Sequence, residues 1–115
     1  MPRAFLVTDS EWVTNDVLAA LSIDDWKVES IGDPHSVLDS VEEASPEAVI
    51  VDMQITSMGG MAVIREIRSS IDEAERPRTV LLLDRSADEF LAGRAGADAS
   101  VLKPFEAAEL RNALQ

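Results

Sequence analysis

Five short runs typical of strands, four of them largely apolar, alternate along this chain with longer stretches whose apolar residues recur at helical spacing. The third run, residues 48–51, is continuous and rich in β-branched side chains, which is typical of a strand buried on both faces of a sheet. The other four runs cover residues 4–7, 26–31, 80–83 and 100–102. Residues 26–31 alternate only weakly and carry charge, which is typical of an edge strand. Strands that alternate with helices form a parallel sheet with helices on both faces. The alternation therefore predicts one α/β domain with five strands and five helices.

The stretches between these runs each carry an apolar stripe of the kind that a helix buries. In the first stretch, Val13, Val17 and Leu21 recur at intervals of four residues. Gly96 follows the fourth stripe, where a glycine can adopt the left-handed conformation that ends a helix. We expect each stripe to face the sheet. The later stripes are Val37, Leu38 and Val41; Ile64, Ile67 and Ile71; Phe90, Leu91 and Ala95; and Ala107, Leu110 and Leu114.

The bulk properties exclude several classes of protein. A chain of 115 residues with 46% hydrophobic and 28% charged residues is long enough for one core and too apolar to be disordered. It has no apolar run long enough to span a membrane, and no cysteine for a disulfide or a thiolate metal site. Its formal net charge of −12 would repel a nucleic-acid backbone. Basic partners or divalent cations would suit this charge, but for the charge as a whole we favour the simpler interpretation that it keeps the protein soluble. We expect a cytoplasmic protein that binds neither nucleic acid nor membrane directly.

Charged residues stand at the ends of four of the five predicted strands, namely Asp9, Asp52, Asp84 and Lys103. The carboxyl ends of parallel strands share one edge of a sheet, and ligand sites form at that edge in folds of this kind. Clustered carboxylates repel each other by about 4 kcal/mol per pair at ~4 Å and an effective dielectric of ~20. Such a cluster therefore needs a compensating cation or partner.

These residue types suit phosphoryl chemistry. Carboxylate oxygens bind Mg²⁺, a lysine ammonium can hold a phosphate oxygen, and a carboxylate beside both can attack phosphorus. The alternative is structural: Asp9 and Asp84 would cap helices, and Lys103 would form an ion pair. A dinucleotide or P-loop site is not indicated, since no glycine-rich loop follows the first strand.

Two segments resemble the receiver domain of response regulators, which has the CheY-like fold. Residues 46–54, continuing through 58–60, resemble the phosphorylation strand and the loop after it. Residues 95–98 and 103–105 resemble the final strand with its lysine and proline. The resemblance covers essentially the whole chain. It implies a flavodoxin-like three-layer fold with a five-stranded parallel sheet in the order 2-1-3-4-5.

The resemblance implies a role for each matching residue. Asp52 would accept a phosphoryl group from the phosphohistidine of a histidine kinase. Asp9, Asp52 and the backbone carbonyl of Gln54 would hold Mg²⁺. Lys103 would pair with a phosphoryl oxygen, and the peptide bond before Pro104 would be cis. Gln54 also occupies the position at which the family tunes the rate of dephosphorylation.

The end of the first strand departs from the family pattern. Receivers usually have two acidic residues there, whereas this chain has Thr8 and Asp9. One acidic charge is missing, so Mg²⁺ should bind more weakly than in a typical receiver. The loop after the acceptor also differs, with Thr56 where proline is common and Gly59 where a polar residue is common.

Three further departures fall on the switch positions. Asp84 stands where a serine or threonine hydroxyl is usual, and a carboxylate cannot donate that hydrogen bond unless it is protonated. We expect Asp84 to repel a phosphoryl group, and pairing with Lys103 is an open alternative for its charge. Arg85 replaces a small residue and would block the site, pair with Asp84 or replace the lost donor. Ser100 replaces the aromatic residue that rotates when the switch is thrown.

Our first hypothesis is a two-component receiver domain, residues 1–115 with no output domain, that is phosphorylated on Asp52 and signals through protein contacts. It would be a signalling domain and not an enzyme, beyond self-phosphorylation and autodephosphorylation. Its partners would be a histidine kinase, a downstream protein or both, and it would be a monomer or a homodimer.

The alternative is an atypical receiver that acts as an interaction module without phosphorylation. A third hypothesis is a flavin- or nucleotide-binding protein, which the acidic strand ends disfavour. Trp12 and Trp26 are candidate partner contacts.

Overall fold

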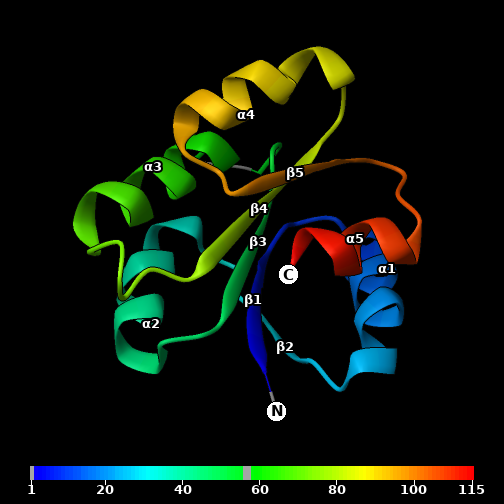
Figure 1. Ribbon diagram of the computed structural model, residues 1–115, viewed down its shortest axis with the longest axis horizontal. Coiled ribbons are helices and arrows are strands. Elements are labelled where there is room, and N and C mark those ends of the chain that lie inside the picture. Colours follow the sequence, from blue (N-terminus) through cyan, green and yellow to red (C-terminus); the bar gives the residue numbers. More distant parts are fainter. Residues whose placement is uncertain (1, 56–57) are drawn as a thin grey trace.

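The computed structural model describes residues 2–55 and 58–115, and it contains all five predicted strands. Thr56, which departs from the family pattern, lies outside the described residues. The strands pair in parallel in the order β2-β1-β3-β4-β5, which confirms the predicted topology (Figure 1). They are β1 (Arg3–Val7), β2 (Lys27–Ser30), β3 (Ala48–Asp52), β4 (Arg78–Leu83) and β5 (Ala99–Leu102).

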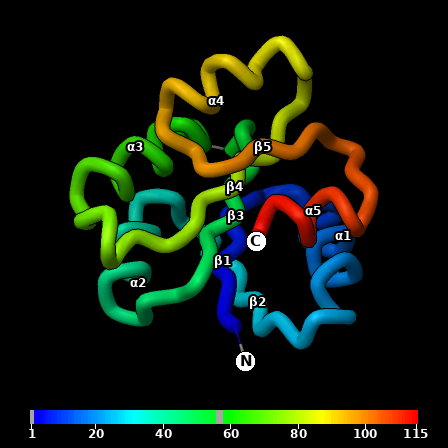
Figure 2. Tube along the Cα trace, in the orientation of Figure 1, coloured from blue at the N-terminus to red at the C-terminus, as the bar shows by residue number. Residues whose placement is uncertain are grey.

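The helices form a layer on each side of this sheet. The α1 and α5 helices pack against each other on one face, and α2, α3 and α4 cover the other, as both the ribbon and the Cα tube show (Figures 1 and 2). In the described part of the chain, no helix is long and apolar enough to cross a bilayer. The helices are α1 (Glu11–Leu21), α2 (Val37–Ala44), α3 (Gly60–Ser70), α4 (Glu89–Ala95) and α5 (Ala107–Ala113), with 3₁₀ turns η1 (Ser22–Asp24), η2 (Pro34–Ser36) and η3 (Ser86–Asp88).

The central strand β3 is buried along its whole length, which explains its continuous β-branched sequence. Ala48 and Ile50 belong to the apolar cluster beneath α1 and α5. Val49 and Val51 point the other way, into the cluster beneath α2, α3 and α4. Because successive side chains of a strand alternate between the two faces, a strand covered on both sides has no position left for a polar residue until its end.

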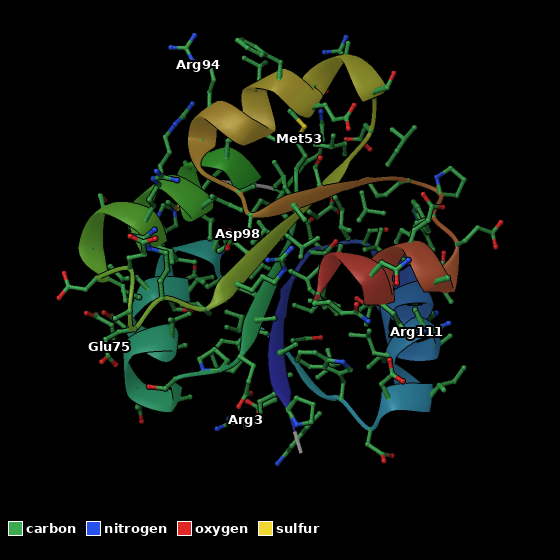
Figure 3. All side chains as sticks on the ribbon, in the orientation of Figure 1. Arg3, Met53, Glu75, Arg94, Asp98 and Arg111 are labelled. Atoms are coloured by element: carbon green, nitrogen blue, oxygen red, sulfur yellow. The ribbon has the colours of Figure 1, made fainter. Side chains whose placement is uncertain are left out.

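Arg111 joins α5 to α1 (Figure 3). Its guanidinium donates to the carbonyl oxygen of Ala20 at 3.3 Å and lies 3.8 Å from the Asp24 carboxylate. Only residues 8–10 separate the carboxyl end of β1 from the first turn of α1. The contact between α5 and α1 therefore helps to fix the helix whose beginning adjoins the candidate site.

Of the three apolar residues that predicted the fourth helix, Ala95 is buried as expected, but Phe90 and Leu91 are not. Phe90 is 70% exposed and Leu91 is also exposed. The buried stripe of α4 and its preceding turn is Asp88, Ala92 and Ala95, at i, i+4 and i+7. The 3₁₀ turn η3 sets this helical phase, and the small alanines pack against the sheet. The prediction that Gly96 ends the helix is confirmed, since its φ of 98° lies in the left-handed region.

Candidate functional site

The ends of four strands bring the predicted charged residues to one edge of the sheet. Asp52 is the last residue of β3, Asp9 follows β1 by two positions, and Asp84 and Lys103 directly follow β4 and β5. The backbone N–H of Lys103 donates to the carbonyl oxygen of Leu83 at 2.8 Å, which extends the pairing of β5 with β4. This hydrogen bond holds the backbone of Lys103, and with it the base of its side chain, beside the end of β4.

The Asp52 carboxylate is buried and hydrogen-bonded on both oxygens. The residue is only 2% exposed. Its Oδ1 lies 2.5 Å from the Lys103 ammonium and accepts a longer hydrogen bond, 3.4 Å, from the backbone N–H of Gln54. Its Oδ2 accepts a 2.7 Å hydrogen bond from the Thr8 hydroxyl. A buried charge needs such partners because water no longer solvates it. Without them, the buried charge would destabilise the folded protein.

The Thr8 hydroxyl links Asp52 to the loop before α1. It donates to Asp52 and accepts a 3.1 Å hydrogen bond from the backbone N–H of Ser10. In the sequence, Thr8 stands where receivers usually have an acidic residue. In the structure, Thr8 supplies a neutral hydrogen-bond donor to the Asp52 carboxylate at the position where an acidic residue was expected.

The Lys103 ammonium is shared between two carboxylates. It lies 3.0 Å from Oδ1 of Asp84 in addition to its contact with Asp52, and its side chain is only 7% exposed. Burial alone would lower the pKa of Lys103, but the hydrogen bonds and charges of Asp52 and Asp84 outweigh burial and raise that pKa above its ordinary value. The lysine is therefore a fixed cation at this edge, and the open alternative that Asp84 pairs with it is confirmed.

The Arg85 side chain takes none of the three alternatives considered from the sequence. Its guanidinium forms an ion pair of 3.1 Å with Asp88, a buried residue at the end of η3. The hydrogen bond from Arg85 to Asp88 raises the pKa of the guanidinium. The physical reason is local: the turn η3 places the carboxylate of Asp88, three residues further along the chain, within reach of the guanidinium.

The remaining predicted residues lie beside the pair of Asp52 and Lys103. Asp9 and Gln54 are exposed at the carboxyl ends of β1 and β3. The Lys103–Pro104 peptide bond is cis, as the resemblance implied. Ser100 lies inside β5 and lines a groove of about 590 Å³ bounded by β4, β5, α4 and α5. The short side chain leaves this groove open at the position where receivers usually carry an aromatic residue.

Gly60 brings the beginning of α3 against the end of β3. A Cβ atom at Gly60 would overlap the backbone oxygen of Asp52 and lie 2.9 Å from Cα of Met53. The backbone N–H of Gly60 instead donates to the carbonyl oxygen of Met53 at 3.1 Å. The close approach of these two segments therefore requires glycine, and it fixes the backbone that carries the acceptor.

Sequence reasoning missed three contacts at this site: Thr8 on Asp52, Asp88 on Arg85, and Trp12 on Lys103. The Trp12 ring centroid lies 6.0 Å from the Lys103 ammonium, at the distance of a cation–π contact. The spacing of Asp88 from Arg85 signalled a possible pair, but nothing in the sequence connects Trp12 with Lys103. Only the tertiary fold brings these two residues, from the first and last thirds of the chain, together.

The donor set is sparse for a divalent cation. Among the described residues, no three acidic, histidine or cysteine side chains form a group that could hold a metal ion. The oxygen atoms suited to Mg²⁺ are those of the Asp9 and Asp52 carboxylates and the Gln54 carbonyl, with water to complete the coordination. This chemistry fits Mg²⁺, with one carboxylate fewer than the family pattern has.

The doubly wound sheet, with a buried carboxylate–lysine pair at its carboxyl edge, defines a class of small α/β signalling domains. Residues 4–115 match the response regulator receiver domain family, and the chain belongs to this family. It is 35% identical over 112 residues to response regulator MprA of Mycolicibacterium vanbaalenii, which covers 96% of this chain and 48% of the relative. The chain thus spans about half the length of the curated relatives that it matches.

Solved structures show the same fold. The receiver domain of a sensor histidine kinase from Pseudomonas aeruginosa superposes with a TM-score of 0.85 at 25% identity, over 99% of this chain and 94% of that one. That domain holds a magnesium ion in its active site cleft. The chemotaxis response regulator CheY4 of Vibrio cholerae gives a TM-score of 0.83 at 23% identity, over 100% and 97% of the two chains, which shows the shared fold. Family membership displaces the flavin- or nucleotide-binding hypothesis.

Proposed function

We propose that Asp52 is the phosphoryl acceptor of this receiver domain and that a phosphohistidine of a histidine kinase is its donor. The observation that carries this proposal is the buried Asp52 carboxylate held 2.5 Å from the Lys103 ammonium. In the transfer, an Asp52 oxygen forms a bond to phosphorus as the phosphorus–nitrogen bond of the donor breaks. The histidine nitrogen keeps the electron pair of that bond, and the ring takes up one proton from solvent and is left as neutral imidazole.

The described residues have distinct roles in this step. Lys103 neutralises charge on the transferring group by pairing with one of its oxygens. Thr8 orients the carboxylate through the hydrogen bond to Oδ2. Asp84 opposes the transfer, because its carboxylate already holds the same ammonium and repels the incoming negative charge.

We also propose that Mg²⁺ binds beside Asp52, with Asp9 and the backbone carbonyl of Gln54 as the other protein ligands. When bound, Mg²⁺ supplies further neutralisation of charge on the phosphoryl oxygens. Two features support this proposal: the oxygen donors at the ends of β1 and β3, and the magnesium ion in the related Pseudomonas domain. With Thr8 in place of an acid, we infer that the affinity is lower than that of a typical receiver.

The proposed partners are a histidine kinase, which donates the phosphoryl group, and a downstream protein or effector domain, which reads its presence. The domain signals through contacts and turns over no substrate beyond its own phosphorylation and dephosphorylation. Asp84, Arg85 and Ser100 motivate a second candidate, an interaction module that needs no phosphorylation. Family membership and the intact pair of Asp52 and Lys103 favour the phosphorylated form of signalling.

The deciding experiment is to incubate the protein with Mg²⁺ and acetyl phosphate and to measure its intact mass. We expect a Mg²⁺-dependent phosphoryl adduct that is absent from Asp52→Asn and retained by Asp39→Asn, which changes an exposed aspartate on α2. An adduct that persists in Asp52→Asn would refute the assignment of the acceptor. Absence of an adduct with both acetyl phosphate and a panel of phosphorylated histidine kinases would favour the phosphorylation-independent module.

A further inference from the structure

Trp12 reaches the acceptor site from outside the residues that the family pattern supplies. It is the second residue of α1, and its ring centroid lies 6.0 Å from the Lys103 ammonium. Its side chain is not part of the core, because the residue is 49% exposed and the buried residues of α1 are Val13, Val17, Ala20 and Leu21. The ring position therefore needs an explanation other than packing of the helix.

The Lys103 ammonium is subject to opposed attractions. The buried Asp52, 2.5 Å away, attracts it toward the interior of the site. The more exposed Asp84, 3.0 Å away, attracts it toward the solvent. An aromatic face attracts a cation through its quadrupole, and this attraction strengthens where water is excluded. With its side chain only 7% exposed, the ammonium is in such an environment. The indole ring is thus a third partner, and an uncharged one, for this cation.

We propose that Trp12 is a positioning residue for phosphoryl transfer, which holds the Lys103 ammonium over Asp52. The inference rests on the proposed function of Asp52 as the acceptor. As an Asp52 oxygen bonds to phosphorus, acetyl phosphate releases acetate, which keeps the electron pair of the broken phosphorus–oxygen bond. The phosphoryl oxygens need a cation beside them during this step. An ammonium that has moved outward with Asp84 would serve them less well.

A ring serves this role better than a charged residue would. A third carboxylate near Lys103 would compete with Asp52 and repel the phosphoryl group. The indole holds the cation without adding negative charge to a site that already contains Asp52 and Asp84. It also covers part of the lysine, which limits access of water and reagents to the ammonium.

The test compares Trp12→Phe, Trp12→Leu and Trp12→Ala. Phenylalanine keeps an aromatic face, leucine keeps apolar cover without a face, and alanine removes both. Two rates are measured for each variant: phosphorylation at saturating acetyl phosphate and Mg²⁺, and acetylation of Lys103 by a small amine-reactive reagent. The chain has only two lysines, so the exposed Lys27 is an internal reference in every peptide-mass measurement.

We expect Trp12→Leu and Trp12→Ala to acetylate Lys103 roughly fivefold faster relative to Lys27, and to lose roughly fivefold in maximal phosphorylation rate. The acetyl phosphate concentration for half-maximal rate should stay unchanged, and Trp12→Phe should recover most of both effects. The proposal is overturned if leucine and alanine match wild type in either rate, or if phenylalanine behaves like leucine. If wild type takes up no phosphoryl group from acetyl phosphate or from any phosphorylated histidine kinase of the panel, the proposed function fails and the transfer role fails with it. The acetylation ratio still reports whether the ring holds Lys103.

Discussion

Asp84 and Lys103 form an ion pair of 3.0 Å in the unphosphorylated protein. The same ammonium lies 2.5 Å from Asp52, so one lysine serves both the proposed acceptor and the carboxylate at the end of the neighbouring strand. A phosphoryl group on Asp52 has to compete with Asp84 for this cation. The Asp84 carboxylate would thereby destabilise the protein phosphorylated on Asp52 relative to the unphosphorylated protein.

Replacement of Asp84 by threonine should raise the steady-state level of phosphorylated Asp52 by roughly three- to tenfold, because the competing carboxylate is removed. The free energy of unfolding should fall by less than about 1 kcal/mol, since a half-exposed ion pair contributes little. Intact mass spectrometry after incubation with acetyl phosphate measures the level, with Asp39→Asn as the control. A level equal to that of wild type would show that Asp84 does not compete.

Loss of Lys103 should cost more stability than loss of the Asp52 charge. Lys103→Met leaves the buried Asp52 with only hydrogen-bond donors, and we expect a loss of about 3 kcal/mol. Asp52→Asn leaves Lys103 paired with Asp84, and we expect about 1 kcal/mol. Urea unfolding of both variants and of the double variant measures the coupling. Strictly additive losses would mean that the two side chains do not stabilise each other.

An acidic residue at position 8 should restore the missing metal ligand. We expect Thr8→Asp to raise the Mg²⁺ affinity about tenfold. A fluorescence titration of Trp12, in a Trp26→Phe background, measures it. Thr8→Val is the matched control: it removes the donor to Asp52 at a cost of about 1–2 kcal/mol in stability but adds no charge. Equal affinities of Thr8→Asp and wild type would contradict the proposed position of the metal ion.

Two glycine substitutions should have opposite effects. Gly60→Ala places a methyl group against the backbone of Asp52 and Met53, and we expect a loss of about 2 kcal/mol. Gly93→Ala, within α4, meets no atom within 4 Å and should be neutral or stabilise by up to about 1 kcal/mol through helix propensity. Thermal and urea unfolding compare them. A Gly60→Ala protein as stable as wild type would mean that α3 can move away from β3 at no cost.

The Lys103 ion pairs should give stability a dependence on alkaline pH. Burial opposes the charged form of Lys103, but Asp52 and Asp84 outweigh it, so the folded-state pKa is raised above the ordinary value of 10.5. A raised lysine pKa contributes stability that is complete below pH 10.5 and is lost as pH rises through the folded-state pKa.

The measurement is the difference in unfolding free energy between wild type and Lys103→Met across this range. The difference should be constant below pH 10.5 and shrink above it. The chain has no tyrosine and no cysteine, and Lys27 is common to both proteins, so few other groups interfere. A difference that stays constant throughout would indicate that Lys103 contributes through packing alone.

Sequence patterns were sufficient to predict the fold because the residue pattern of each strand indicates which of its faces are buried. The run ending at Asp52 has no polar position, which requires cover on both faces, and the alternation with helices then requires parallel pairing. The same reasoning placed Asp52, Asp84 and Lys103 at one edge. These inferences depend only on backbone direction, so they survive errors of one or two residues in the bounds of an element.

Side-chain partners could not be predicted in the same way. The choice of Asp88 by Arg85 depends on the turn η3, and the exposure of Phe90 depends on the helical phase that this turn sets. Both depend on the packing of a few residues. The hydrophobicity of Phe90 predicted burial, whereas its side chain is exposed. The contact of Trp12 with Lys103 joins residues from the first and last thirds of the chain, which no local pattern connects.

The two outer strands of the sheet differ in a way that bears on aggregation. The strand most suited to forming intermolecular β-structure, β3, lies in the middle with both sides paired. At one outer edge, β2 has only four residues and exposes Lys27 and Glu29, charges that discourage a strand of another molecule from adding there. The opposite edge, β5, carries no charge between Ala99 and Leu102. Both outer strands are short, with four residues each, so addition of a foreign strand is opposed by charge at β2 and by strand length alone at β5.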